Sequence, residues 1–341
     1  MRYSQQIKQT KQNRLVAYSI LLVIFLIFIW YFNLMFISRP ISAQASVLGV
    51  STSDNQKDYQ IYPYPVLKTQ SKPLDLARYW ALIDADSGKT IISSKSDAVV
   101  PIASTTKIMT ALIVLTEVKD LSQKVEIQKE INGIYQNTQR LRWGDEYTVE
   151  NLLYLLLLES DNQAANSLAF FVAGVKNTSV SGWQPRINVF VQMMNERAAQ
   201  IGLTQTKFLD PAGLDESTSS TSLEMTALTR QALKNASFQK FVSTANRSVN
   251  NITGSKTFDL KNSNRLISEW AYPGAIGVKT GFLPNSSSSD LSAGHCLIAA
   301  AKRNNHTLIA AVYNTYGEAS TSSATAAKEL LDFGFENVEW H

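Results

Sequence analysis

The strongest constraint on this chain is an apolar segment near its N-terminus. Residues 15–37 contain no formally charged side chain, and their clearly polar members are Ser19 and Asn33. As an α-helix, the segment would be about 35 Å long, which is enough to cross a hydrocarbon core of roughly 30 Å. The sequence therefore predicts one transmembrane helix over residues 15–37.

The charges beside this segment predict its orientation. Residues 1–14 contain four bases and no acid, whereas Arg39 alone follows closely. Because basic flanks stay in the cytoplasm, we expect a cytoplasmic tail over residues 1–14 and an extracytoplasmic chain after residue 38, in a single-pass membrane protein. The tripeptide Ala-Gln-Ala at 43–45 offers signal-peptide cleavage as an alternative, although the apolar run is longer than a cleaved signal usually has. Both alternatives export the remainder.

The composition argues against several classes of function. Without the four N-terminal bases, the 32 Lys and Arg residues fall to 28, which equals the 28 acids, so no nucleic-acid partner is predicted. Cys296, the only cysteine, rules out an intramolecular disulfide and a multi-cysteine metal site. The chain has three histidines, which are His295, His306 and His341. They are too few and too scattered to favour a Ser-His-Asp triad or a zinc hydrolase. We therefore expect neither a metal nor a cofactor.

Beyond the apolar segment, the sequence predicts a linker and one catalytic domain. Residues 38–71 are rich in Ser, Gln, Asp, Tyr and Pro without a sustained period, which is typical of a linker. In residues 72–341 we expect a hairpin first, helices in the middle and strands last, which favours an α+β fold with an antiparallel sheet and a helical cluster. The expected strands are 79–84, 90–92, 274–280 and 296–313, the last with a turn at 302–306, and the expected helices are 104–118, 149–172, 188–202, 222–233 and 324–333.

A serine and a lysine at the start of the first expected helix can supply a nucleophile and its base. Ser104 and Lys107 form Ser-x-x-Lys, and residues three apart on a helix share a face. Ser104 would lie at the helix N-terminus, where unpaired N–H groups favour a developing oxyanion. The apolar helix would desolvate Lys107 and lower its pKa toward that of a usable base. The pattern is common, however, and Ser237 with Lys240 also matches it.

Two further motifs carry polar side chains suited to a peptide substrate. Ser160 and Asn162 belong to a Ser-Asp-Asn at an expected helix junction, where the serine can relay a proton and the asparagine can hold a substrate backbone. Lys279, Thr280 and Gly281 end a strand and offer a cation, a hydroxyl and a residue without a side chain to a peptide at the strand edge. Neither motif is decisive alone, because the predicted linker contains an identical Ser-Asp-Asn.

The order of the three motifs indicates a family. Ser-x-x-Lys, Ser-x-Asn and Lys-Thr-Gly in this order are the signature set of penicillin-recognising serine enzymes. Over most of the chain after the linker, the sequence resembles the serine D-Ala-D-Ala carboxypeptidase family of low-molecular-weight penicillin-binding proteins. This resemblance implies a β-lactamase/transpeptidase-like fold, peptidoglycan stem peptides as substrates and β-lactams as inhibitors. It rests further on segments 101–112, 194–208, 210–215, 262–266 and 331–335.

The resemblance implies how the reaction begins. Ser104 would attack the carbonyl between the last two D-alanines while Lys107 takes its proton. Ser160 with Lys279 would deliver a proton to the leaving amine. The backbone N–H groups of Ser104 and Phe282 would form the oxyanion hole.

The same resemblance implies how the substrate is held and released. Asn162 and Thr280 would hold the substrate amide and the terminal carboxylate, beside the strand that ends at Gly281. Water would then hydrolyse the acyl-enzyme, and a β-lactam would trap Ser104 as a slow mimic of that intermediate. The implied activity is therefore that of a penicillin-sensitive serine D-Ala-D-Ala carboxypeptidase.

Departures from the family pattern keep other functions open. Asp161 stands where this family usually has glycine, so residues 160–166 look rather like a class A β-lactamase. The Glu-x-x-Leu-Asn of that class is missing downstream of Ser160, because the first glutamate after it, Glu196, precedes Arg-Ala-Ala-Gln. Serines at 286–289 also lengthen the link after Lys-Thr-Gly. A non-catalytic wall-binding homologue is the remaining alternative, and the three intact motifs argue against it.

An absent arginine favours D,D-endopeptidase activity on cross-links. Many relatives place an arginine between the final strand and the final helix, where it grips the terminal carboxylate, but residues 317–325 contain no base. Such a charge-assisted hydrogen bond contributes roughly 1.5–3 kcal/mol, so selectivity for a free C-terminus should fall by about 10- to 150-fold. We expect tolerance of amidated or extended termini unless another cation, such as Lys302 or Arg303, has taken its place.

Overall fold

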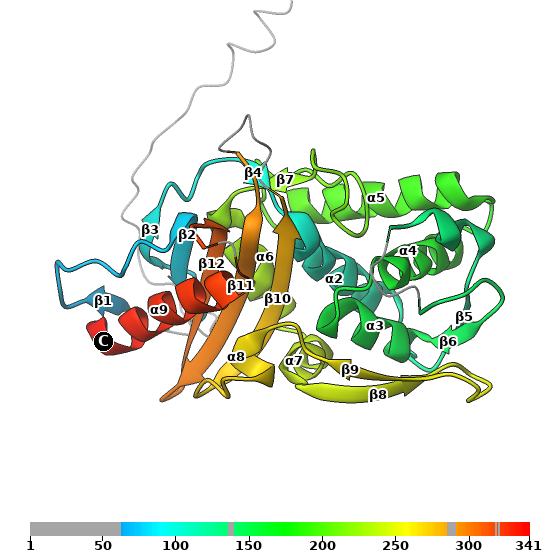
Figure 1. Ribbon diagram of the computed structural model, residues 1–341. Coiled ribbons are helices and arrows are strands. Elements are labelled where there is room, and N and C mark those ends of the chain that lie inside the picture. The colour runs from blue at the N-terminus through cyan, green and yellow to red at the C-terminus, as the bar shows by residue number, and fades with distance from the viewer. Residues whose placement is uncertain (1–62, 136–139, 285–290, 318, 320) are drawn as a thin grey trace, which may run out of the picture. The chain divides into compact units, whose positions relative to one another are not determined.

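The computed structural model describes residues 63–135, 140–284, 291–317, 319 and 321–341 (Figure 1). The expected cytoplasmic tail, the transmembrane helix and the Ala-Gln-Ala at 43–45 lie outside these ranges. Within them, no helix combines the length and the apolar character needed to cross a membrane.

A five-stranded antiparallel sheet forms the centre of the fold, as the sequence predicts. Its strand order is β10-β11-β12-β2-β3, so β10 lies at one edge. The middle residues of β11 and β12 are apolar and buried, because both faces of the sheet are covered. Asn304 and Asn305, both with positive φ, form the two-residue turn between them. The strands are β2 (Ala77–Asp84), β3 (Thr90–Ser94), β10 (Ala275–Leu283), β11 (Gly294–Arg303) and β12 (His306–Thr315).

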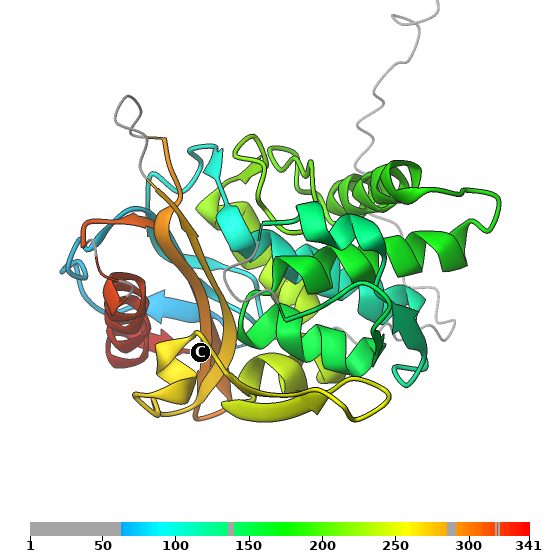
Figure 2. The same ribbon diagram turned by 45° about the vertical axis from the view of Figure 1, so that its right-hand side comes forward.

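Helices cover both faces of this sheet (Figure 2). On one face, α9 (Thr321–Asn337) packs its alanines and leucines against the sheet, where Leu82, Leu297 and Leu308 are fully buried. The other face carries the helical cluster and the larger hydrophobic core. The cluster consists of α2 (Lys107–Glu117), α3 (Val149–Leu158), α4 (Asn162–Lys176), α5 (Trp183–Gln200), α6 (Ser222–Ala232) and α7 (Ala236–Ser243).

The helical pattern expected over 149–172 is divided into α3 and α4. Thr148 caps the start of α3 by accepting a hydrogen bond from the Asn151 N–H. Asp161 caps α4 in the same way, accepting from the Ala164 N–H at 2.7 Å. Between the two helices, Ser160 takes a positive φ of 63°, which breaks the helical path. The junction therefore falls at Ser-Asp-Asn, where the sequence predicts it.

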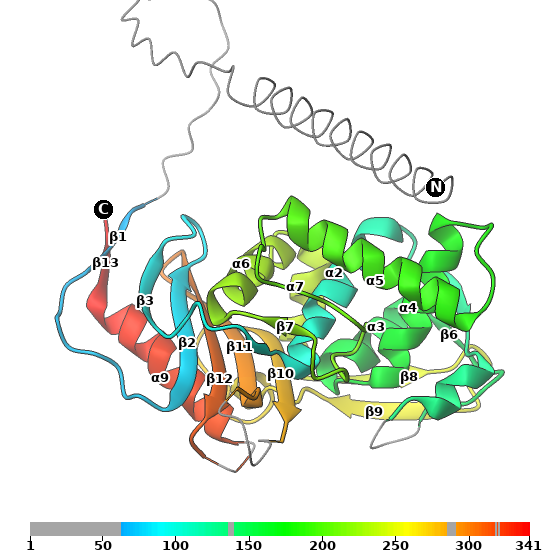
Figure 3. The same cartoon turned by 90° about the horizontal axis from the view of Figure 1, so that it is seen from above.

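The structure contains several short strands that were not predicted. One of them, β1, shows that the folded domain starts earlier than expected. β1 (Pro65–Leu67) pairs with β13 (Val338–Trp340), and the two lie side by side in Figure 3. The boundary expected at residue 72 is therefore too late, because residues 65–67 of the predicted linker belong to the folded domain. The other unpredicted pairs are β4 (Val100–Pro101) with β7 (Ser219–Ser220), β5 (Lys124–Glu126) with β6 (Glu146–Thr148), and β8 (Asn246–Asn250) with β9 (Thr257–Lys261).

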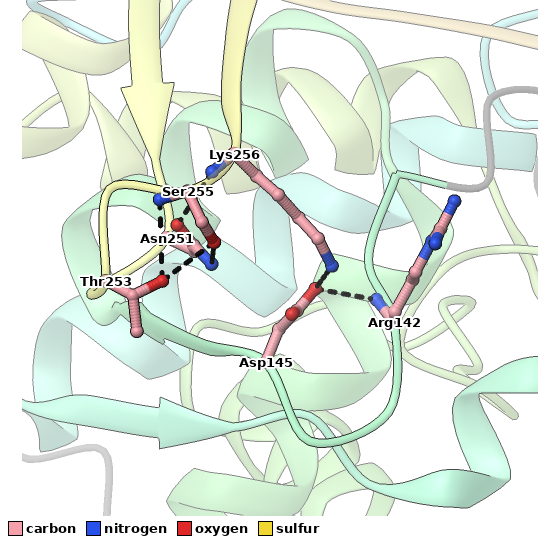
Figure 4. A network of polar contacts seen from close by, with 6 residues as sticks. All are labelled: Arg142, Asp145, Asn251, Thr253, Ser255 and Lys256. Carbon is pink, nitrogen blue, oxygen red and sulfur yellow. Dashed lines mark hydrogen bonds and ion pairs between the residues drawn. The ribbon is translucent and has the colours of Figure 1, made fainter.

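A polar network ties the β8–β9 hairpin to the turn before β6 (Figure 4). Asp145 forms an ion pair with Lys256 and also accepts a hydrogen bond from the Arg142 N–H. In the hairpin turn, the Asn251 side chain accepts from the Lys256 N–H and donates to the Ser255 hydroxyl, both at 3.0 Å. The network fixes the segment that leads into α3, the helix that ends at the Ser-Asp-Asn junction.

We predict that Trp340 contributes substantially to domain stability. Its indole N–H donates to Asp84 Oδ1 at 3.0 Å, and its ring stacks on His306 with centroids 4.1 Å apart. Trp340→Ala should lower the free energy of unfolding by about 2–3 kcal/mol, because the fully buried Asp84 loses a donor and the ring contact is lost. Trp340→Phe should cost about 1 kcal/mol.

Urea denaturation measures both effects. Trp270→Ala, at an exposed tryptophan, is the matched control and should change the free energy of unfolding by less than about 0.5 kcal/mol. An unchanged unfolding midpoint for Trp340→Ala would show that the β1–β13 pair adds little to the domain.

Candidate active site

Ser104 lies in a short 3₁₀ turn, η1 (Ala103–Thr106), that leads directly into α2. The sequence predicts an α-helix from Ser104, whereas the α-helical segment begins at Lys107. The 3₁₀ turn serves the chemistry well, because residues three apart eclipse each other in this geometry. Thr105 anchors the turn to the sheet, since its buried hydroxyl contacts the Ile102 carbonyl at 2.6 Å and the Tyr313 hydroxyl at 2.8 Å.

Lys107 is completely buried and makes three hydrogen bonds at its amine. Nζ lies 2.9 Å from Ser104 Oγ, 2.6 Å from Asn162 Oδ1 and 2.7 Å from the Ala212 carbonyl oxygen. The structure therefore brings together the first motif and the asparagine of the second.

Burial decides the charge state of Lys107. Loss of hydration lowers the pKa of Lys107 from 10.5 to about 7, although the carboxylates of Asp210 and Asp161 partly oppose this effect. A neutral amine has two N–H groups and one lone pair. The Ala212 carbonyl and the Asn162 amide oxygen can only accept hydrogen bonds, so of the three partners only the Ser104 hydroxyl can donate to the lone pair. The geometry thus suits transfer of the Ser104 proton to Lys107.

The loop that carries Ala212 was not predicted to contribute to the site. Asp210 shapes it, because Oδ1 accepts from the N–H groups of Ala212 at 2.6 Å and Gly213 at 2.7 Å, and Oδ2 from that of Asp215 at 2.8 Å. Gly213 has a φ of +75°, and a Cβ there would lie 1.9 Å from the Ala103 carbonyl oxygen. The sequence signal was the segment 210–215, which served above only as evidence for the family resemblance.

The Ser-Asp-Asn junction places three polar side chains in different surroundings. Asn162 joins Lys107 to the neighbouring loop, since its Nδ2 donates to the Tyr135 carbonyl at 2.8 Å. Asp161 is nearly completely buried, which raises the pKa of its carboxyl, and it acts as the cap of α4. The Ser160 hydroxyl oxygen is buried and has no hydrogen-bond partner among the residues described. Ser160 and Lys279, for which the resemblance implies a shared role in proton delivery, are thus not hydrogen-bonded through the Ser160 hydroxyl in this structure.

The edge strand β10 brings the third motif beside Ser104. A Cβ on Gly281 would lie 3.2 Å from the Ser104 backbone nitrogen and 2.8 Å from Cys296 Sγ, so only glycine fits between them. Lys279 is fully buried, and burial together with the charge of Lys107 holds its pKa well below the usual range. Its Nζ donates to the Thr280 carbonyl at 3.0 Å.

The side chains of Thr280 and Phe282 lie on the same face of β10. The Thr280 hydroxyl lies 2.7 Å from the Ser263 hydroxyl. This partner was not predicted, although Ser263 belongs to the segment 262–266 that carries part of the family resemblance. Phe282 is 53% exposed and stacks on His295, with ring centroids 4.4 Å apart. His295 therefore lies beside Phe282 on the neighbouring strand β11.

Neither cation suggested as a replacement for the absent arginine lies beside Thr280. Thr280 pairs with Leu297, whereas Lys302 and Arg303 end β11 about 17–20 Å farther along the sheet. The Lys302 N–H donates to the Gly274 carbonyl, and the Arg303 guanidinium contacts Asp332 at 3.3 Å. This alternative is therefore wrong for both residues.

We predict that a neutral Lys107 is required for acylation of Ser104 by a β-lactam. Acylation of the unmodified chain should rise about tenfold per pH unit up to pH near 7 and then level, because only the deprotonated amine accepts the serine proton. Lys107→Arg should acylate about 10²- to 10⁴-fold more slowly, because a guanidinium stays protonated.

Stopped-flow measurement of acylation between pH 5 and 9 checks this prediction. Lys240→Arg is the matched control, because it alters the second Ser-x-x-Lys match, where the exposed Lys240 pairs with Glu150. Wild-type acylation by Lys107→Arg at neutral pH would refute the role of Lys107.

The chain is similar to known proteins over most of its length. A family model described as D-alanyl-D-alanine carboxypeptidase matches residues 67–317. The D-alanyl-D-alanine carboxypeptidase of Streptomyces sp. (strain K15) is 35% identical over 260 residues, which cover 73% of this chain and 84% of that protein. The D-alanyl-D-alanine endopeptidase of Pseudomonas aeruginosa is 30% identical over 76% of this chain and 79% of that protein.

Other matches agree with these. D-alanyl-D-alanine carboxypeptidase DacF of Bacillus subtilis (strain 168) is 32% identical over 78% of this chain, although the match covers only 64% of that longer protein. The crystal structure of the Streptomyces K15 DD-transpeptidase has a TM-score of 0.69 to this fold at 32% identity, covering 78% of this chain and 99% of that chain. The chain therefore belongs to the D-alanyl-D-alanine carboxypeptidase family, a family of serine peptidases.

Proposed function

We propose that this protein is a serine D,D-peptidase that cleaves D-Ala-D-Ala in peptidoglycan stem peptides through an acyl-enzyme on Ser104. The observation that carries the proposal is the contact of 2.9 Å between Lys107 Nζ and Ser104 Oγ at a completely buried amine. This contact gives the serine a base that is not a histidine.

Acylation follows from this contact. Lys107 takes the hydroxyl proton while Ser104 Oγ bonds to the carbonyl carbon of the penultimate D-alanine. The negative charge that develops on the carbonyl oxygen is stabilised by the backbone N–H groups of Ser104 and Phe282. The close approach of Gly281 to the Ser104 nitrogen supports this pairing, because it sets the two backbones side by side.

Departure of D-alanine requires a proton on its nitrogen. The Ser160 hydroxyl is suited to deliver it, because its buried oxygen has no other hydrogen-bond partner within the described ranges. The proton that Lys107 took from Ser104 replaces the one that Ser160 gives up, and the ammonium form of Lys279, which burial disfavours, would assist this transfer when substrate fills the site. Asn162 holds the substrate amide, and the Thr280 hydroxyl meets the substrate terminus.

Hydrolysis of the acyl-enzyme by water completes the reaction. A β-lactamase would place a carboxylate to activate that water efficiently. Glu196 lies on α5 and contacts Gln192 on the same helix, and Asp210 already accepts several backbone hydrogen bonds in its loop. Both observations favour slow deacylation, so β-lactams should act as inhibitors and not as substrates.

We propose that endopeptidase activity on cross-links is favoured relative to carboxypeptidase activity. The segment 317–325 contains no base, and Lys302 and Arg303 lie far from Thr280 along the sheet. A relative from Pseudomonas aeruginosa is named an endopeptidase. Weak selection for a free terminal carboxylate would allow extended substrates.

We also propose that the domain works outside a bacterial cell membrane, anchored by a transmembrane helix over residues 15–37. The support is the sequence itself, in which an uncharged apolar run follows a basic tail. A peptidoglycan substrate agrees with this location.

Covalent labelling by a fluorescent penicillin tests the proposed function. We expect one persistent label on Ser104, and none on Ser104→Ala. Ser237→Ala is the matched control, because Ser237 belongs to the chance Ser-x-x-Lys match, and it should label normally. A chain that takes no label would indicate a wall-binding protein, and release within seconds would indicate a β-lactamase.

Mass spectrometry of the mature protein tests the anchor. We expect an intact N-terminal segment, and we expect protease added to spheroplasts to digest the domain while sparing residues 1–14. A mature chain that begins at Ser46 would show that the Ala-Gln-Ala at 43–45 is cleaved and that no anchor is retained.

A further inference from the structure

The residue before the nucleophile has a strained backbone conformation. Ala103 has a φ of +48°, in the left-handed region where a residue with a Cβ is strained. Such strain persists only where the surrounding contacts hold it. Two glycines pack against Ala103, since a Cβ on Gly213 would lie 1.9 Å from its carbonyl oxygen and a Cβ on Gly281 would lie 3.2 Å from its own Cβ. Ser104 therefore follows a position that the rest of the fold must restrain.

A buried tyrosine of the central sheet restrains the residue on the other side of Ser104. Thr105 is fully buried, and its hydroxyl contacts both the Ile102 carbonyl and the Tyr313 hydroxyl. A carbonyl oxygen can only accept a hydrogen bond, so the single hydroxyl proton of Thr105 is directed to Ile102. The Tyr313 hydroxyl must then donate to Thr105. The three groups form one directed chain, from Tyr313 through Thr105 to the carbonyl of Ile102.

Tyr313 gives this chain a rigid support. It lies on β12, the middle strand of the five, and its side chain is fully buried in the core beneath the helical cluster. Within the described ranges, Thr105 is the one hydrogen-bond partner of its hydroxyl. Burial holds the pKa of Tyr313 well above its usual value, so the hydroxyl keeps its proton and remains a donor between pH 5 and 9.

We infer that Tyr313 is a positioning residue for the nucleophile, because its hydroxyl, acting through Thr105, fixes the turn that presents Ser104. The turn carries both the Oγ that contacts Lys107 and the backbone N–H that faces the reacting carbonyl. A small rotation of the turn would misplace both groups at once, and catalysis is sensitive to such errors. Tyr313 lies beneath the turn and acts only through its neighbour. This inference rests on the proposed function.

The test measures acylation of Ser104 by fluorescent penicillin over a range of penicillin concentrations, which separates binding from the acylation step. Tyr313→Phe should lower the acylation rate constant about 5- to 10-fold with an unchanged Kd, because the turn loses one hydrogen bond. The pH profile should keep its midpoint, since Lys107 is not altered. Tyr272→Phe is the matched control and should leave the rate constant unchanged, because it removes a buried hydroxyl that donates to Asp332 on the α9 side of the sheet.

A double-mutant cycle tests whether Tyr313 acts through Thr105. Thr105→Val removes the hydroxyl that receives the hydrogen bond and should slow acylation at least as much as Tyr313→Phe does. Adding Tyr313→Phe to Thr105→Val should then slow it less than about twofold further, because residues that act as one unit are not additive. Thr105→Ser keeps the hydroxyl and should retain most of the rate constant.

Three outcomes would overturn the inference: an unchanged acylation rate constant in Tyr313→Phe, effects of the two substitutions that simply multiply, or a shifted pH midpoint, which would assign the effect to the charge of Lys107. A misfolded fraction in any variant lowers the amplitude of labelling and not its rate constant, so a loss of stability is not mistaken for a loss of alignment. Failure of the proposed function has another signature, since the unmodified chain would then take no label at Ser104.

Discussion

The structure of this site depends on the burial of one amine. Lys107 is buried where water cannot hydrate a cation, and three oxygen atoms form hydrogen bonds with its amine in place of water. Those oxygens come from three separate parts of the chain: the nucleophile turn, the junction of α3 and α4, and the loop shaped by Asp210. Buried polar groups tolerate few errors, because any missing partner is costly. The cluster around Lys107 therefore fixes the relative placement of the helices that build it.

The position of β10 is constrained in a complementary way. Lys279 is a second buried amine. A positive charge on it would be repelled by a positive charge on Lys107. Two ammonium groups this close in a poorly hydrated region disfavour each other, so the site works with at least one of them neutral. Gly281 keeps the strand close enough to Ser104 for the backbone amides to act together, since any side chain there would meet Cys296.

The sequence predicts the local parts of this site well and the distant partners poorly. Ser104 and Lys107 lie three residues apart, so their contact follows from helical geometry alone, and the five-stranded sheet follows from long apolar runs. β8 exposes most of its polar residues and buries Val249, so it shows no alternation that could be recognised. Ser263 meets Thr280 across a gap of 17 residues, and Ala212 meets Lys107 across 105. Such contacts arise from tertiary packing, which propensity and periodicity do not encode.

The pairing of β1 with β13 has a mechanical consequence. Lys89, in the turn between β2 and β3, donates to the Pro65 carbonyl, which places β1 near the β3 side of the sheet, opposite the catalytic edge. With four strand spacings between β3 and β10, the two edges are separated by about 19 Å. A pull on the chain before residue 63 would load the main-chain hydrogen bonds of this small pair first. The nucleophile turn and β10 would thereby be insulated from such a pull, and the bonds that align Ser104 would not be distorted by it.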